Sequence, residues 1–246
     1  MNPILSTALG SLLVAGTCAW GMLFHTGFET PDYTVDQPLP GQDGWTTVLA
    51  PNAIVVVGDH ETASSGRRAI RCWGGGDLVS TGGLLDAACE QVIDFDPITD
   101  PCEVRVEADI RLDGPDTGSG PGDDLLSANL MARNSVGQRR SPFLYLSSNG
   151  NVYAGSESDQ GNSYYKFETP ITPGAYNHLA IVLNYRTHIA TFEVNGNVIG
   201  SLPFGGAGEQ WRGVLLELAA WDDPSFDPSL YTGYWDNVSV QAKPAH

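Results

Sequence analysis

The chain has 246 residues, and 12 lysines and arginines oppose 29 aspartates and glutamates, which gives a formal net charge of −17. Such an acidic surface repels phosphate backbones, which argues against nucleic-acid binding, and it attracts cations such as Ca²⁺. Alternatively, the charge only keeps the protein soluble in a salty or extracellular setting. The 29 glycines and 16 prolines, with many short apolar runs, indicate a single all-β domain.

An uncharged segment opens the chain. Residues 4–24 resemble a secretory signal peptide, with a cleavage site at 17–19 (TCA) before Trp20. The alternatives are an uncleaved membrane anchor, because the run is long enough to span a bilayer, or a pair of buried strands. We take 1–24 as the signal peptide or hydrophobic segment, 25–241 as the folded domain and 242–246 as a disordered tail. A cleaved chain is expected to be secreted, either extracellular or at the cell surface. Only an uncleaved segment would bring it to a membrane.

Three cysteines remain after such a cleavage, namely Cys72, Cys89 and Cys102. An odd number leaves at most one bridge and one free thiol, and a bridge is expected in an exported protein. The pairs Cys72–Cys89 and Cys89–Cys102 both remain open. No CxxC pair or Cys/His cluster is present, which argues against a zinc site.

Two motifs at opposite ends of the domain form a matched pair. The first is GFE at 27–29, followed by Trp45, and the second is GYWDNVSV at 233–240. Together they resemble the first and closing strands of secreted β-sandwich modules, including carbohydrate-binding ones, and this resemblance implies that the two strands pair. It also implies a structural Ca²⁺ held by Glu29 and Asp236. In the alternative, these carboxylates only accept hydrogen bonds at strand ends, since two carboxylates underfill the 6–8 oxygens that Ca²⁺ takes.

Short apolar stretches between turns predict strands at 55–57, 69–73, within 84–95, 103–112, 125–133, 142–146 and 152–154. The clearest is 103–112 (EVRVEADIRL), where apolar and charged residues alternate. Successive side chains of a strand point to opposite faces, so Glu107 and Asp109 are expected on the face away from the core. The segment 211–221 (WRGVLLELAAW) suits a helix by propensity, but the alternation of its aliphatic residues favours a strand.

The segment 174–204 carries the most information about the fold. Residues 179–183 are apolar on both faces, 189–194 alternate, and Asn195-Gly196 supplies the positive φ angles of a tight hairpin before 198–202. The order of an Asn-His pair, an apolar strand, a polar turn, a strand and Asn-Gly resembles the concanavalin A-like (laminin G-like) superfamily of secreted bacterial type. The resemblance implies an antiparallel two-sheet jelly-roll β-sandwich. This fold hosts lectins, glycosidases, lyases and adhesion modules, so it leaves the activity open.

Short motifs within these predicted strands resemble motifs of two enzyme families. Glu107 and Asp109 resemble the alternating carboxylates of family-16 glycoside hydrolases, although Arg111 stands where a second glutamate is needed. RVE at 105–107 and YYKF at 164–167 resemble two strands of the alginate lyases, without their Gln-x-His element. One alternative is therefore a polysaccharide lyase or glycoside hydrolase that works through Glu107, Asp109, Tyr165 and Lys166 on the concave sheet. The simpler interpretation of the charged row is a solvated face of cross-strand ion pairs.

Aromatic side chains are the candidates for sugar binding, because they combine an apolar face with a polar tip. The candidates are Trp211, Trp221, Tyr164, Tyr165 and Tyr231. For each of them the alternative is packing in the core. We predict a secreted, non-catalytic β-sandwich that binds a polysaccharide or other glycan, or that contacts other surface proteins. A structural envelope or matrix protein is a further alternative.

Overall fold

The computed structural model describes residues 19–29, 31–58, 63–76, 78–81, 84–97, 102–115, 126–134, 142–158, 161–167, 171–172, 174–205, 211–221 and 226–244. Within these ranges the chain forms the strands β1 to β16 and one short 3-10 helix at Pro228–Leu230. In this part of the chain no helix has the length and apolar character needed to span a membrane.

The strands are β1 (Gly21–Thr26), β2 (Trp45–Leu49), β3 (Ile54–Val57), β4 (Ala69–Trp73), β5 (Val79–Thr81), β6 (Leu84–Val92), β7 (Cys102–Asp113), β8 (Leu126–Asn134), β9 (Phe143–Ser147), β10 (Val152–Ser158), β11 (Gly161–Phe167), β12 (Asn177–Asn184), β13 (Ile189–Val194), β14 (Asn197–Pro203), β15 (Trp211–Trp221) and β16 (Thr232–Pro244).

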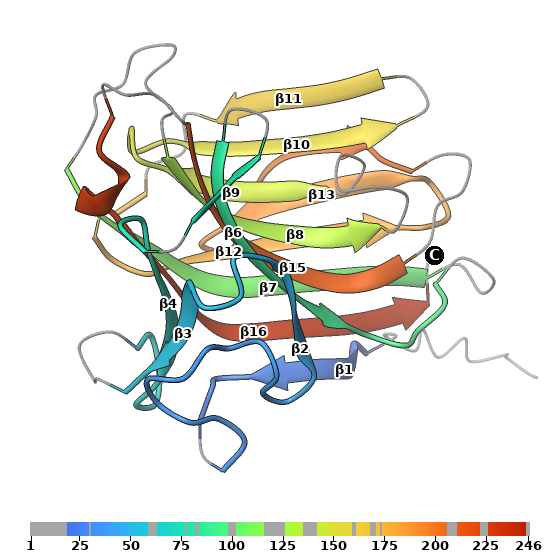
Figure 1. Ribbon diagram of the computed structural model, residues 1–246. Coiled ribbons are helices and arrows are strands. Elements are labelled where there is room, and N and C mark those ends of the chain that lie inside the picture. The colour runs from blue at the N-terminus through green and yellow to red at the C-terminus, as the bar shows by residue number, and fades with distance from the viewer. Residues whose placement is uncertain are drawn as a thin grey trace, which may run out of the picture.

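These strands form two antiparallel sheets that lie face to face (Figure 1). Sheet A has the order β14-β13-β12-β7-β16-β4-β3, and β1 also pairs with β16. Sheet B has the order β11-β10-β9-β8-β15-β6-β2, and β5 also pairs with β6. The predicted all-β, two-sheet sandwich is therefore confirmed, and the arrangement is consistent with a jelly roll.

The alternation of β7 shows how the sequence builds the core. Its even-numbered residues from Cys102 to Ile110 are buried, while the odd-numbered residues between them are only partly buried. The buried side chains meet those of sheet B, and the largest fully buried ones include Trp45, Phe192 and Trp235. Each such side chain contributes roughly 2–3 kcal/mol by leaving water. The two outward faces are left free to carry polar chemistry.

The expected hairpins around Asn195-Gly196 are confirmed as β12, β13 and β14. Asn195 and Gly196 have φ angles of 50° and 78°, in the left-handed region that such a turn requires. The side chain of Asn195 also accepts a hydrogen bond from the backbone N–H of His178 at 2.9 Å. The turn is thereby tied to the start of β12.

The strand predicted at 211–221 is confirmed as β15, with the same bounds. Tertiary pairing outweighs helix propensity here, because β15 lies between β6 and β8 and pairs with both along its length. A bulge near its start depends on Gly213, whose φ is 146°. A Cβ atom at Gly213 would lie 2.0 Å from the carbonyl oxygen of Gln91, so only glycine fits.

The two ends of the chain pair as the matched motifs predict. β1 runs antiparallel to β16, with Thr26 opposite Val238 (Figure 1). β1 begins at Gly21, inside the segment 1–24, and β16 continues to Pro244, past the expected domain end at 241. Cleavage before Trp20 would leave β1 whole. The motif TCA at 17–19 falls largely on residues that lie outside the described ones.

The cysteines differ from the sequence expectation of one bridge. Cys72, Cys89 and Cys102 are all buried, and no disulfide joins any two of these three described residues. Burial raises the pKa of the Cys72 thiol to about 12 and raises that of Cys89 well above its usual range. Both side chains behave as small apolar core residues.

Candidate functional site

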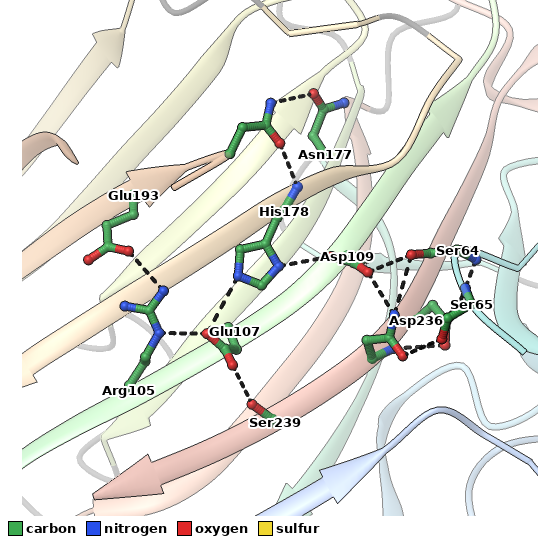
Figure 2. A network of polar contacts seen from close by, with 12 residues as sticks. Ser64, Ser65, Arg105, Glu107, Asp109, Asn177, His178, Glu193, Asp236 and Ser239 are labelled. Atoms are coloured by element: carbon green, nitrogen blue, oxygen red, sulfur yellow. Dashed lines mark hydrogen bonds and ion pairs between the residues drawn. The ribbon is translucent and has the colours of Figure 1, made fainter. Parts of the chain in front are cut away.

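The outer face of sheet A carries a dense polar network (Figure 2). Its centre is His178 on β12, opposite Asp109 on β7 in the antiparallel register. Nδ1 of His178 lies 2.8 Å from Oδ1 of Asp109, and Nε2 lies 3.5 Å from Oε2 of Glu107. Hydrogen bonds to Asp109 and then Glu107 raise the pKa of His178 to about 9. The imidazole is therefore a cation held between two carboxylates.

Both carboxylates have further partners in the same network. Burial raises the pKa of Glu107, but hydrogen bonds from His178, Arg105 and Ser239 outweigh it and lower the value to about 2. Arg105 bridges from Glu107 to Glu193 on β13, at 2.5 and 2.8 Å. These contacts match the simpler interpretation of the charged row, cross-strand ion pairs on a half-solvated face.

Asp109 and Asp236 extend the network to the loop before β4. Asp236 is fully buried, and its Oδ2 accepts hydrogen bonds from the N–H groups of Ser64 and Ser65, both at 2.9 Å (Figure 2). Burial raises the pKa of Asp236 to about 6, although these hydrogen bonds act to lower it. Ser64 Oγ donates to Asp109 at 2.5 Å.

Glu29 binds the same loop at its next residues, Arg67 and Arg68, through hydrogen bonds. Its Oε1 accepts from the N–H groups of Arg67 and Arg68, at 2.6 and 3.0 Å. Glu29 and Asp236 thus accept hydrogen bonds from four backbone amides of one loop. This is the hydrogen-bonding role that the sequence offers as the alternative to a calcium site.

Oε1 of Glu29 and both carboxylate oxygens of Asp236 accept hydrogen bonds from backbone N–H groups. The described residues contain no group of three or more His, Cys, Asp or Glu that could hold a metal ion. As arranged, the two carboxylates do not supply the oxygen-rich shell of Ca²⁺. Calcium binding stays a prediction from the sequence.

The outer face of sheet B is different, because it is hollowed. A cavity of about 500 Å³ lies over β8, β9, β11 and β15, and we call it the sheet B cavity. Its lining includes Asn129, Met131, Phe143, Tyr145, Tyr164, Glu217 and Trp221. Aromatic rings thus surround two polar side chains.

Strand register places the polar residues in one row across the sheet. Asn129 on β8 lies opposite Glu217 on β15 and opposite Tyr145 on β9, and Tyr145 lies opposite Tyr153 on β10. Directly opposed residues point to the same face. The next residue in the row is Lys166 on β11, opposite Tyr153.

Glu217 is held in place by Asn129. The Nδ2 group of Asn129 donates to Oε2 of Glu217 at 3.0 Å, and the backbone carbonyl of Asn129 accepts from Trp235 Nε1 at 3.0 Å. Burial, followed by the negative charge of Asp86, raises the pKa of Glu217 to about 8, against the opposing effects of Asn129 and Arg133. At neutral pH this carboxyl group is mostly protonated and can donate a hydrogen bond.

The aromatic side chains that line the cavity stack on neighbouring rings. The rings of Tyr145 and Tyr153 stack with centroids 5.2 Å apart, and those of Phe143 and Tyr145 stack with centroids 5.9 Å apart. The hydroxyls of Tyr145 and Tyr164 are hydrogen-bonded to each other. Tyr164 and Trp221 are each about half exposed, at 52%, so their rings are accessible from solvent.

The structure separates the predicted sugar-binding residues. Tyr164 and Trp221 line the sheet B cavity, whereas Trp211 and Tyr231 are core residues with 8% and 3% exposure. A ring that packs in the core has no free face for a sugar. Tyr165 is 54% exposed but lies opposite the core residue Ala154, so it points to the other side of β11 from Tyr164.

The predicted catalytic set is divided between the two sheets. Glu107 and Asp109 lie on β7 in sheet A, whereas Tyr165 and Lys166 lie on β11 in sheet B. Neighbouring residues of a strand point to opposite faces, so Tyr165 and Lys166 also diverge from each other. These four residues do not converge on one cleft.

Sequence reasoning missed Asn129, Tyr145 and Glu217. A signal was present, since Glu217 is the only acidic residue in the apolar run WRGVLLELAAW. A lone carboxyl in a strand that is otherwise buried must meet a specific partner or a cavity. Asn129 and Tyr145 show no such signal, because only strand pairing brings them beside Glu217.

Comparisons with known proteins show the fold alone. No protein-family model matches this sequence, and no curated protein is similar to it. A carbohydrate esterase of the Shiga toxin-encoding bacteriophage phi24B is 11% identical with a TM-score of 0.58, covering 91% of this chain and 99% of that chain. An endo-β-1,4-glucuronan lyase from the fungus Trichoderma reesei is 13% identical with a TM-score of 0.56, covering 89% and 94%. The binding domain of botulinum neurotoxin serotype D/C is 8% identical with a TM-score of 0.53, covering 89% and 48%.

Proposed function

We propose that this protein binds carbohydrate in the sheet B cavity. The observation that carries the proposal is the cavity itself, which is lined by the half-exposed rings of Tyr164 and Trp221 and by a hydrogen-bonded pair, Asn129 and Glu217. Its volume of about 500 Å³ falls within the range of small-molecule sites. Sugars present apolar C–H faces and a rim of hydroxyls, which match these two kinds of lining.

The fold supports the proposal indirectly. The similar structures named above include an esterase of carbohydrates and a lyase of glucuronan. Since one fold hosts many functions, this likeness adds weight only because the cavity independently has a suitable lining. The outer face of sheet A is less suited to binding a sugar, because its charged side chains already form ion pairs with one another.

The test uses pairs of matched variants. Trp221→Ala and Tyr164→Ala remove rings from the cavity, whereas Trp73→Ala and Tyr165→Ala remove equally exposed rings elsewhere, with exposures of 49% and 54%. Trp73 lies on β4 in sheet A. Oligosaccharide binding is first found on a glycan array and then measured by titration calorimetry.

We expect each cavity variant to weaken binding by about fivefold to thirtyfold, since a stacked ring contributes on the order of 1–2 kcal/mol. The two control variants should bind like the unmodified protein. Equal losses in the cavity and control variants would refute this site. No binding to any glycan would refute the function.

A catalytic role is the second candidate, and the protonated Glu217 favours it. A carboxyl group whose pKa is near 8 inside a binding cavity has the property of a general acid. Polysaccharides incubated with the protein would then gain reducing ends, and Glu217→Gln would abolish this gain while binding persists. If the number of reducing ends stays constant for every polysaccharide tested, the catalytic role is refuted and the protein is a non-catalytic binding module.

Secretion is part of the same proposal. Its support is the uncharged segment 4–24 and the position of β1, which begins just after the expected cleavage site. The mass of the exported protein should correspond to a chain that starts at Trp20. A mass that retains residue 1 would contradict cleavage.

A further inference from the structure

The lining of the sheet B cavity carries few charged groups. Of the described residues that line it, Glu217 is the one acidic residue, and none is lysine or arginine. The other lining residues are apolar, aromatic or neutral polar. Asp86 on the neighbouring strand β6 adds a second carboxyl group close enough to raise the pKa of Glu217.

Two arginines and one lysine occur on this face outside the cavity lining, and Arg133 is close enough to Glu217 to act against the rise in its pKa. Arg133 and Arg212 both contact Glu90, at 3.5 and 2.6 Å, and Arg212 makes further hydrogen bonds to that carboxylate. Glu90 is buried, so Arg212 and Arg133 compensate its charge, and the charge of Arg133 is shared between Glu90 and Glu217. Lys166 lies on the edge strand β11, beyond Tyr153, and it is not among the described lining residues.

This pattern bears on the charge of the ligand. Proteins usually hold a carboxylate with arginine or lysine, because a carboxylate that loses water without a cation is strongly disfavoured. A uronic acid in this cavity would find no such partner among the described lining residues, and the chain's net charge of −17 would repel it at long range. A neutral sugar meets neither obstacle.

We infer that the sheet B cavity takes uncharged sugars and discriminates against uronic acids. The inference rests on the proposed carbohydrate binding and narrows its ligand class. Glu217 fits this role through its geometry. Glu217 lines the cavity and Asn129 donates to its Oε2, so a protonated carboxyl group can donate its proton from the other oxygen, Oε1, to a sugar hydroxyl or ring oxygen.

The test compares oligosaccharides that differ only at C6, where one member has a hydroxymethyl group and the other a carboxylate. Pairs with the same linkage and length are titrated at pH 7 and 150 mM salt, where long-range repulsion is largely screened. We expect the neutral member to bind at least about tenfold more tightly. Equal or tighter binding of the uronate would overturn the inference and leave carbohydrate binding intact.

A charge-gain variant makes the test sharper. Met131→Lys places a cation in the cavity lining, and Val198→Lys places the same charge on the exposed β14 in sheet A, where Val198 is 65% exposed. Met131→Lys should raise uronate affinity by about tenfold, and Val198→Lys should not. Equal gains in both variants would show a general charge effect and overturn the inference. If neither sugar of any pair binds, the proposed function itself fails.

Discussion

Replacing Glu217 by glutamine should stabilise the protein increasingly as the pH rises. The carboxyl pKa is about 8 in the folded protein and 4.5 in its ordinary state, so the folded state retains a proton that the unfolded state releases between these values. Folding stability therefore falls as the pH increases through this window. Glutamine resembles the protonated form and has no such titration.

The magnitude follows from the difference in pKa. A shift from 4.5 to about 8, at about 1.4 kcal/mol for each unit, corresponds to a loss of about 4–5 kcal/mol once Glu217 is fully ionised. The cavity side of the carboxyl group meets solvent, which reduces this penalty. We expect the unmodified protein to lose about 2–4 kcal/mol relative to Glu217→Gln between pH 5 and pH 9.

Urea unfolding followed by tryptophan fluorescence measures this at each pH, since the chain has six tryptophans. The difference between the two proteins isolates Glu217, because other titrating groups are common to both. If Glu217→Gln destabilises the protein by the same amount at every pH, the reasoning about its protonation is refuted.

Three further predictions concern sheet A and the core. Because His178 is a cation between two carboxylates, its pKa in the native protein, measured by NMR, should be near 9. The free energy that its ion pairs add to folding should be fully present below pH 6.5 and lost as the pH rises to 9. A measured pKa near 6.5 would contradict the ion pairs. Asp236→Asn should destabilise the protein by about 1–3 kcal/mol with calcium and with chelator alike, because the buried carboxylate holds loop amides. A calcium-dependent rise in Tm that Asp236→Asn and Glu29→Gln both abolish would instead support the structural metal. Cys72 and Cys89 should react with a thiol reagent only in denaturant, because both are buried with raised pKa values; rapid reaction in the native state would show that the core is open.

Much of the fold could be predicted from local patterns. The alternation in β7, the Asn195-Gly196 turn and the paired end motifs each depend on residues close together in the sequence or on a recognisable strand pair. The conformation of β15 is harder to predict from the sequence, because its composition suits a helix. Its place between β6 and β8 decides its conformation.

The candidate site could be predicted only in part. The sequence indicates that Tyr164 and Trp221 are possible sugar contacts, but it equally suggests Trp211 and Tyr231, which the structure buries. Exposure depends on which face of which sheet a strand presents. That property is set by neighbours far away in the chain.

By itself, the sequence determined an acidic, all-β chain with its turns, its buried strand faces and the pairing of its two ends, because these follow from side-chain period, glycine and asparagine at turns, and charge. Tertiary structure alone decided where the chemistry lies. Asn129, Tyr145 and Glu217 are far apart along the chain and become neighbours only through strand order in sheet B. The same packing surrounds Glu217 with low-dielectric protein and places Asp86 nearby, which gives an ordinary glutamate its raised pKa.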